Sequence, residues 1–95
     1  NGYTVMDRAT YVSLKNTIKL QVMVEGDEVL LNHISVIPIN PKMFQKTNYS
    51  DAMSFVAWLT DPEKGQKLIS DFGKKKYGSQ LFFPDSKQWH EKQKK

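Results

Sequence analysis

Few side chains in this sequence of 95 residues are suited to catalysis. There are two histidines, His33 and His90, and no cysteine, which excludes thiolate nucleophiles, disulfides and sulfur-ligated zinc together. Neither histidine lies in a His-Glu-x-x-His pattern, and no Gly-x-Ser-x-Gly turn occurs. His33 has apolar neighbours, which favours a structural role over a ligand role, and His90 lies among charged residues. The sequence therefore predicts no enzyme, with no catalytic residue, metal site or cofactor.

The segment from Thr4 to Thr10 is the candidate for binding a small anion. A β-prone run carrying the Thr4 hydroxyl leads into a helix start beside Asp7 and Arg8. Helix N-termini present unpaired amides and partial positive charge, so such a junction can hold an oxyanion. The residue types favour a structural alternative, in which Asp7 caps its own helix and Arg8 makes an ion pair at the surface or between lobes. From the residues alone both interpretations stay open.

The positive charge of the chain is concentrated at its end. Residues 1–73 carry seven positive and eight negative charges, whereas residues 74–95 carry seven positive and two negative ones. A nucleic-acid-binding domain spreads Lys and Arg along one element, and the single arginine here suits base readout poorly. No apolar run approaches the roughly 18 residues that a membrane helix requires. We expect neither nucleic-acid binding nor a transmembrane segment.

Hydrophobic periodicity predicts strands interleaved with helices. Helical spacing occurs in three places, from Arg8 to Asn16, after a cap at Ser50 or Asp51, and from Asp61-Pro62 to a left-handed Gly73. The β-prone runs are residues 3–6, 18–24, 34–39 and 80–83, and the second ends in an acidic turn at residues 25–28. This order predicts an α/β fold of three to four strands with three helices over residues 1–85, followed by a mobile basic tail at residues 86–95.

Several strings of the sequence, in order, resemble one protein family. They are Tyr3-Thr4-Val5-Met6-Asp7-Arg8-Ala9-Thr10-Tyr11, Val24-Glu25-Gly26-Asp27, Leu30-Leu31-Asn32, Val36-Ile37-Pro38-Ile39-Asn40-Pro41, Trp58-Leu59-Thr60-Asp61-Pro62-Glu63, Gly65-Gln66 and Leu81-Phe82-Phe83-Pro84-Asp85. These strings look like the carboxyl-terminal portion of the tungstate-binding proteins that serve ABC importers, which are related to the molybdate-binding proteins. The resemblance covers Gly2 to Asp85, and it corresponds to about the last third of such a protein.

The resemblance implies part of one lobe of a type II periplasmic binding protein, which holds a tungstate or molybdate dianion in a cleft between two lobes. It further implies a periplasmic or other extracytoplasmic location, an ABC importer permease as partner, and no enzymatic activity. Thr4, Asp7 and Arg8 would lie nearest the anion: Arg8 would neutralise charge, the Thr4 hydroxyl would donate, and Asp7 would orient Arg8. We expect residues 1–95 alone to bind tungstate weakly or not at all, because the other cleft contacts of the family are missing from them.

Two alternative functions remain open at the level of sequence. The chain could be a standalone interaction module that forms a homodimer through the apolar segment Ile34–Ile39. It could also bind nucleic acid through its basic end, residues 74–95, in which case its affinity for DNA would fall as salt rises.

Overall fold

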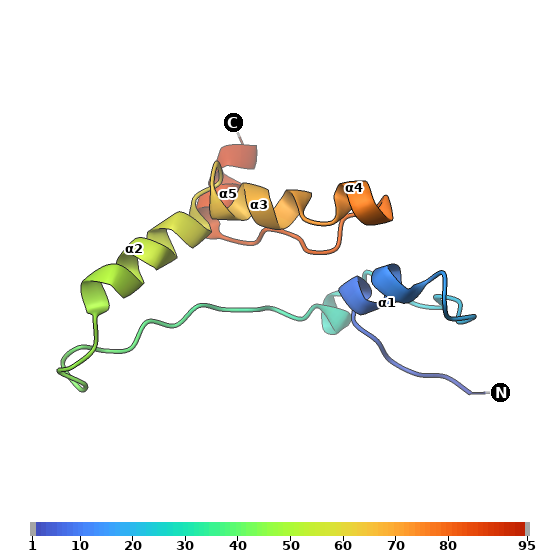
Figure 1. The fold of residues 1–95 in the computed structure, drawn as a ribbon, viewed down its shortest axis with the longest axis horizontal. Helices are drawn as coiled ribbons and strands as arrows, with labels where there is room; N and C mark the ends of the chain where they lie inside the picture. The colour runs from blue at the N-terminus through green and yellow to red at the C-terminus, as the bar shows by residue number, and fades with distance from the viewer. Residues whose placement is uncertain (1, 95) are drawn as a thin grey trace.

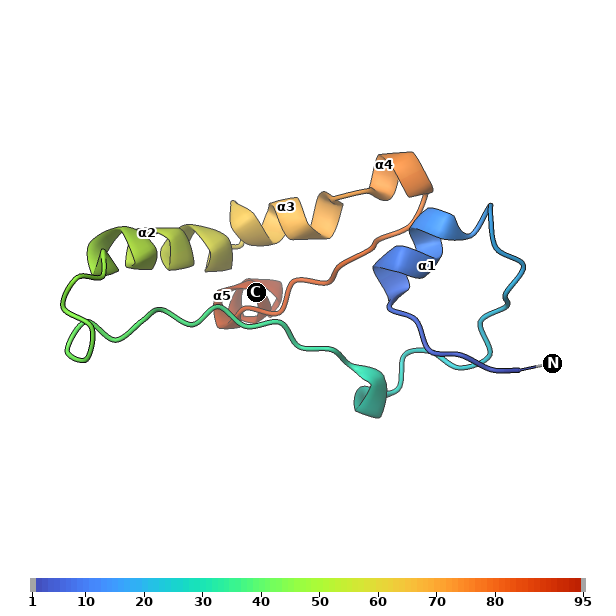
Figure 2. The same ribbon diagram turned by 60° about the horizontal axis from the view of Figure 1, so that its bottom comes forward.

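A computed structural model describes residues 2–94 of the chain, which form helices joined by long extended segments (Figure 1). The elements in chain order are α1 (Arg8–Leu14), the 3-10 helix η1 (Glu28–Leu30), α2 (Tyr49–Thr60), α3 (Gly65–Asp71), α4 (Lys74–Tyr77) and α5 (Lys87–Gln93). Helices α2, α3 and α4 follow one another in a row, and the segment that leads back to α5 runs alongside α3 (Figures 1 and 2). No helix of residues 2–94 has both the length and the hydrophobicity needed to span a bilayer.

The molecule is open and elongated, with principal extents of 54 × 34 × 25 Å. Its radius of gyration is 17.3 Å, whereas a compact chain of this length has about 12 Å. The accessible surface is 8516 Å², roughly 2,900 Å² more than a compact protein of 11.0 kDa exposes. Among residues 2–94 the buried apolar side chains are Val12 and Leu81 alone. The chain therefore lacks the single hydrophobic core of an independent domain.

The predicted α/β fold of three to four strands is wrong, because residues 2–94 contain no strand. The four β-prone runs are present as segments without regular secondary structure, and residues 32–39 make no backbone–backbone hydrogen bond within the described part of the chain. A helix satisfies its own amides, but a strand needs a neighbour about 4.8 Å away to bond its amides and carbonyls. The apolar residues alternate as in a strand, but within residues 2–94 no segment pairs with them to form a ladder.

Side-chain capping determines where α1 and α2 begin. The Asp7 carboxylate accepts a hydrogen bond from the Thr10 amide, as the sequence predicts for the cap of α1. The cap of α2 is Asn48, not Ser50 or Asp51; its Oδ1 accepts from the Asp51 amide at 3.1 Å, and its Nδ2 donates to the Asp51 carboxylate at 2.7 Å. This reciprocal pair starts the helix about one half-turn earlier than hydrophobic spacing suggests.

The predicted basic tail, residues 86–95, contains helix α5. The Ser86 hydroxyl caps this helix by accepting a hydrogen bond from the Trp89 amide at 3.1 Å. Helix α5 also contacts α2, so the tail is connected to the preceding helices. The mobility of this tail stays a prediction, and Asn1 and Lys95, the ends of the two predicted ranges, lie outside the described residues.

Candidate functional site

The Arg8 side chain, at the start of α1, is held by residues from two distant parts of the chain. Its Nε donates a hydrogen bond to the Gln80 carbonyl oxygen at 2.8 Å, and its Cζ lies 5.5 Å from the centroid of the Phe83 ring. Its Nη1 lies 3.6 Å from Oε2 of Glu25. The guanidinium is thus oriented by a carbonyl and an aromatic face, which suits recognition of an anion by its remaining N–H groups.

Asp7 is occupied by its own helix. Hydrogen bonds from the Thr10 side chain and the Thr10 amide hold the pKa of the Asp7 carboxyl below its usual 3.8. The carboxylate therefore takes up an amide at the N-terminus of α1, and α1 has only seven residues. Within residues 2–94 no ion pair joins Asp7 to Arg8, so Asp7 acts here as a cap and Glu25 is the acidic partner of Arg8.

Thr4 is exposed, and its hydroxyl makes no hydrogen bond to another group in the described residues. The structure thus brings Arg8 together with Gln80, Phe83 and Glu25, and it leaves the Thr4 side chain apart from that group of contacts. A direct role of Thr4, Asp7 or Arg8 in ligand binding stays a prediction.

The partners of Arg8 were not identified from the sequence. Gln80 is 72 positions away from Arg8, and its backbone carbonyl, not its side chain, makes the contact. No local pattern marks such a carbonyl. Phe83 lies in the Leu81-Phe82-Phe83-Pro84-Asp85 string that carries the family resemblance, and Glu25 lies in the acidic turn. These two were visible as motifs, but only the folded chain places them at Arg8.

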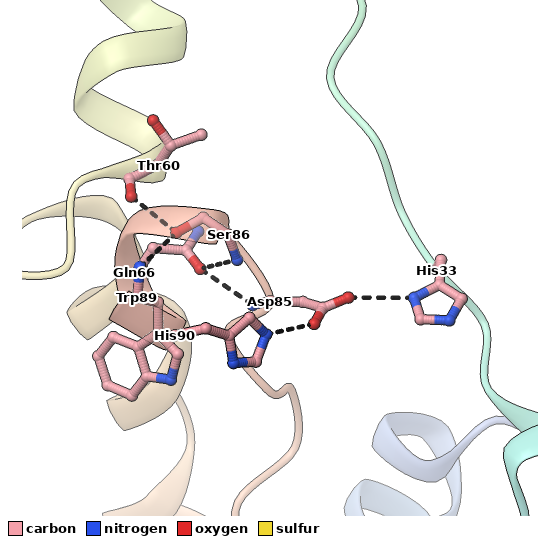
Figure 3. A network of polar contacts seen from close by, with 7 residues as sticks. All are labelled: His33, Thr60, Gln66, Asp85, Ser86, Trp89 and His90. Atoms are coloured by element: carbon pink, nitrogen blue, oxygen red, sulfur yellow. Dashed lines mark hydrogen bonds and ion pairs between the residues drawn. The ribbon is translucent and has the colours of Figure 1, made fainter. Parts of the chain in front are cut away.

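A second polar cluster is centred on Asp85, where the extended segment around residue 33 meets helix α5 (Figure 3). The two carboxylate oxygens of Asp85 contact different histidines: Oδ2 lies 3.1 Å from Nδ1 of His33, and Oδ1 lies 2.7 Å from Nε2 of His90. All three side chains are more than half exposed. His33 therefore has the structural role that the sequence favours, but it has that role at the surface.

The buried amide of Gln66 lies on the side of Asp85 away from His33 and supports this cluster (Figure 3). Its Oε1 accepts hydrogen bonds from the backbone amides of Asp85 and Ser86 at 3.0 Å each, and its Nε2 donates to the Leu59 carbonyl oxygen at 2.8 Å. The Ser86 hydroxyl also donates to the Thr60 carbonyl oxygen at 2.8 Å. One side chain thus connects the end of α2, the start of α3 and the start of α5.

The Asp85 cluster predicts a loss of stability in acid. Hydrogen bonds from His90 and then His33 lower the pKa of the Asp85 carboxyl from its usual 3.8. A carboxyl with a lowered pKa in the folded state stabilises it above the unfolded pKa, and this contribution is lost as the pH falls through the folded pKa. We expect the Asp85→Asn variant to be less stable than the parent chain above pH 4 and equally stable in stronger acid.

Urea unfolding, followed by helical circular dichroism between pH 2 and pH 7, measures this difference. The effect is at most about 1 kcal/mol, because exposed ion pairs are weak. Glu28→Gln is the matched control, since no ion pair or hydrogen bond involves the Glu28 side chain in residues 2–94. An Asp85→Asn difference that is the same at every pH would show that the carboxylate charge contributes nothing.

The arrangement of polar residues does not suggest a metal site. Within residues 2–94 no three side chains of His, Asp or Glu lie close enough together to hold a metal ion. The Asp85 cluster has one carboxylate whose two oxygens already contact histidines. The polar contacts of this chain instead connect distant segments, and the Arg8 guanidinium is the group among them that is suited to an anion.

Comparison with curated proteins finds relatives that bind anions. The chain is 43% identical over 85 residues to the tungstate-binding protein TupA of Peptoclostridium acidaminophilum, and 37% identical over 90 residues to the TupA of Campylobacter jejuni. It is 40% identical over 90 residues to a putative ABC transporter anion-binding protein of Haloferax volcanii. The chain is homologous to a part of these proteins. The resemblance to tungstate-binding proteins predicted from the sequence strings is confirmed.

The matches cover most of this chain and a minor part of each relative. Each match includes 90% of the chain. It includes only 29% of the P. acidaminophilum protein, 25% of the H. volcanii protein and 32% of the C. jejuni protein. The chain therefore spans about a quarter to a third of the length of these curated relatives. No family model matches the chain, and no solved structure does.

Proposed function

We propose that this chain is one portion of an extracytoplasmic solute-binding protein that captures tungstate or molybdate for an ABC importer. The observation that carries the proposal is the identity of 37–43% to two tungstate-binding proteins over nearly the whole chain. The third relative, named as an anion-binding protein of an ABC transporter, supports the same class of ligand and the permease as partner. The proposed role is binding and delivery, without catalysis.

The exposed apolar surface supports the view that the chain works within a larger assembly. Roughly 2,900 Å² more surface is exposed than in a compact protein of this mass, which is the size of an obligate interface. Much of it comes from residues 20–39, where apolar side chains such as Val29, Ile34 and Ile37 are more than four-fifths exposed. An exposed apolar surface of this extent marks a place where other residues pack against the chain.

Arg8 is the proposed anion contact of this portion. Its side chain is about two-fifths exposed, and its guanidinium is oriented by Gln80 and Phe83, so its terminal N–H groups could bond a tetrahedral oxyanion. Thr4 precedes it in the same segment and would supply a hydroxyl donor. Asp7 would act indirectly, by fixing the first turn of α1 and hence the position of Arg8.

A chimeric receptor tests the proposal. In the P. acidaminophilum tungstate-binding protein, the segment matched by this chain is replaced by residues 1–95, and calorimetry measures the affinity for sodium tungstate. We expect the chimera to bind tungstate, and the chain alone to bind more than about a hundredfold more weakly, because each missing charged hydrogen bond costs about 1.5–3 kcal/mol.

Two results would contradict the proposal. A chimera that keeps the helical circular dichroism and thermal transition of the parent receptor but binds neither tungstate nor molybdate would remove the anion-binding role. Submicromolar binding by the chain alone would show that it assembles a complete site, and would contradict its role as one portion of a larger receptor.

A further inference from the structure

The Arg8 guanidinium is fixed at two of its sides and accessible at the third. The Gln80 carbonyl oxygen takes the Nε hydrogen at 2.8 Å, and the Phe83 ring lies against the planar group with 5.5 Å between Cζ and the ring centroid. Neither of these two contacts uses the terminal Nη1 and Nη2 groups. These two nitrogens form the edge with which a guanidinium makes paired bonds to an oxyanion.

Glu25 lies beside one of these two nitrogens, Nη1, without a direct hydrogen bond to it. Its Oε2 is 3.6 Å from Nη1, which is longer than the 2.7–3.2 Å of a protein hydrogen bond. The Glu25 side chain is 67% exposed, and in residues 2–94 this ion pair is the only polar contact of its carboxylate. An exposed ion pair without a hydrogen bond is weak, so little free energy holds the carboxylate in place.

The backbone, not the side chain, brings Glu25 to Arg8. The Tyr11 hydroxyl of α1 donates to the Leu20 carbonyl oxygen at 2.9 Å, which attaches the segment before Glu25 to the same helix that carries Arg8. Gly26 has a φ of 79°, a left-handed conformation that turns the chain directly after Glu25. The carboxylate can therefore leave the guanidinium by rotation of its own side chain, while the backbone stays in position.

We infer that Glu25 is a built-in competitor of the anion: its carboxylate and the bound oxyanion use the same Nη edge of Arg8, and the oxyanion binds by displacing it. This inference rests on the proposed function. Displacement lowers the affinity by the free energy of the Glu25–Arg8 pair, and when the anion leaves, the carboxylate neutralises the guanidinium again. Glu25 thus favours release of the anion as well as limiting its capture.

The test compares Glu25→Gln and Glu28→Gln in the chimeric receptor, with tungstate and perrhenate as probes. Both probes are tetrahedral oxyanions, but tungstate carries two negative charges and perrhenate one. We expect Glu25→Gln to tighten the binding of both anions by the same factor, about 1.5- to fivefold for a pair of this exposure. The factor is equal because the same carboxylate is displaced in each case. Glu28→Gln, which removes a charge from the same turn, leaves both affinities unchanged.

Other results would overturn the inference. Unchanged or weaker binding in Glu25→Gln would show that the carboxylate does not compete. A larger gain for tungstate than for perrhenate would show that Glu25 stays beside the bound anion and repels it by charge, so that no displacement occurs. If the parent chimera binds neither anion and Glu25→Gln binds neither, the inference fails together with the proposed function. If the Glu25→Gln chimera binds the anions and the parent chimera does not, the competition is supported.

Discussion

Replacing Arg8 by alanine lowers the tungstate affinity of the chimeric receptor by an expected 10- to 150-fold. The guanidinium is held by the Gln80 carbonyl oxygen and the Phe83 ring, and the Arg8 side chain is about two-fifths exposed. A charge-assisted hydrogen bond contributes about 1.5–3 kcal/mol, and this range converts to about 10- to 150-fold in the dissociation constant. Calorimetry with sodium tungstate, combined with circular dichroism to confirm that the chimera is folded, measures the effect.

Arg8→Lys separates charge from orientation. Lysine keeps the positive charge but loses the planar group that lies on Phe83 and the Nε donor to Gln80, so we expect an intermediate affinity. Lys19→Ala is the matched control, because Lys19 is an exposed cation of the neighbouring segment and makes no ion pair in the described residues. If Arg8→Ala binds tungstate like the parent, Arg8 serves only to join α1 to residues 80–83.

The features that could be predicted from the sequence are those that neighbouring residues determine. The capping of α1 by Asp7 and the left-handed conformation of Gly73, with a φ of 78°, depend on a few adjacent positions. The presence of helices after residues 50 and 62 was also correct in outline. Their bounds differ because Asn48 caps α2, and because residues 61–64 form a turn before α3 begins at Gly65.

The presence of strands could not be decided from the sequence. Alternation of apolar and polar residues describes one face of a segment, but it does not identify the segment that must pair with it. Leu20 and Val22 lie on the apolar side of the predicted strand at residues 18–24, yet each is nearly half exposed. A strand forms when another segment supplies main-chain partners and an apolar face, and nothing in residues 2–94 does so for this run. The pattern therefore identified apolar residues that other residues must bury, but the fold class that it suggested was wrong.

The candidate site was found only in part, and the reason is sequence separation. Arg8 was recognised from its position after Thr4 and Asp7, but what orients it is a backbone carbonyl 72 positions away and an aromatic ring that sequence spacing does not connect to it. The same holds for Asp85 and His33, which are 52 positions apart. Contacts between residues so far apart in the sequence depend on the path of the whole chain, so no local motif predicts them.

The Gly65→Ala variant destabilises the corner between α2 and α3, with an expected loss of about 1–3 kcal/mol. A Cβ atom built on Gly65 would lie 2.5 Å from the Leu59 Cα, 2.6 Å from its carbonyl oxygen and 2.8 Å from its carbonyl carbon. These are backbone atoms at the end of α2, so they cannot rotate away as a flexible side chain would. Overpacking of this kind costs about 1–3 kcal/mol, and sometimes more, against a gain of up to about 1 kcal/mol in helix propensity.

The damage extends beyond the clash, because the Leu59 carbonyl oxygen is the acceptor for the buried Gln66 amide. If the backbone at Leu59 shifts, Gln66 Nε2 loses its partner, and Gln66 Oε1 is displaced from the amides of Asp85 and Ser86 that it holds. Urea unfolding by circular dichroism therefore reports on α5 as well as on α2 and α3. Gly2→Ala is the control, since a Cβ there meets nothing within 4 Å. Equal stability of the two variants would mean that the corner relaxes freely, and that Gln66 does not depend on the close approach of Gly65 to Leu59.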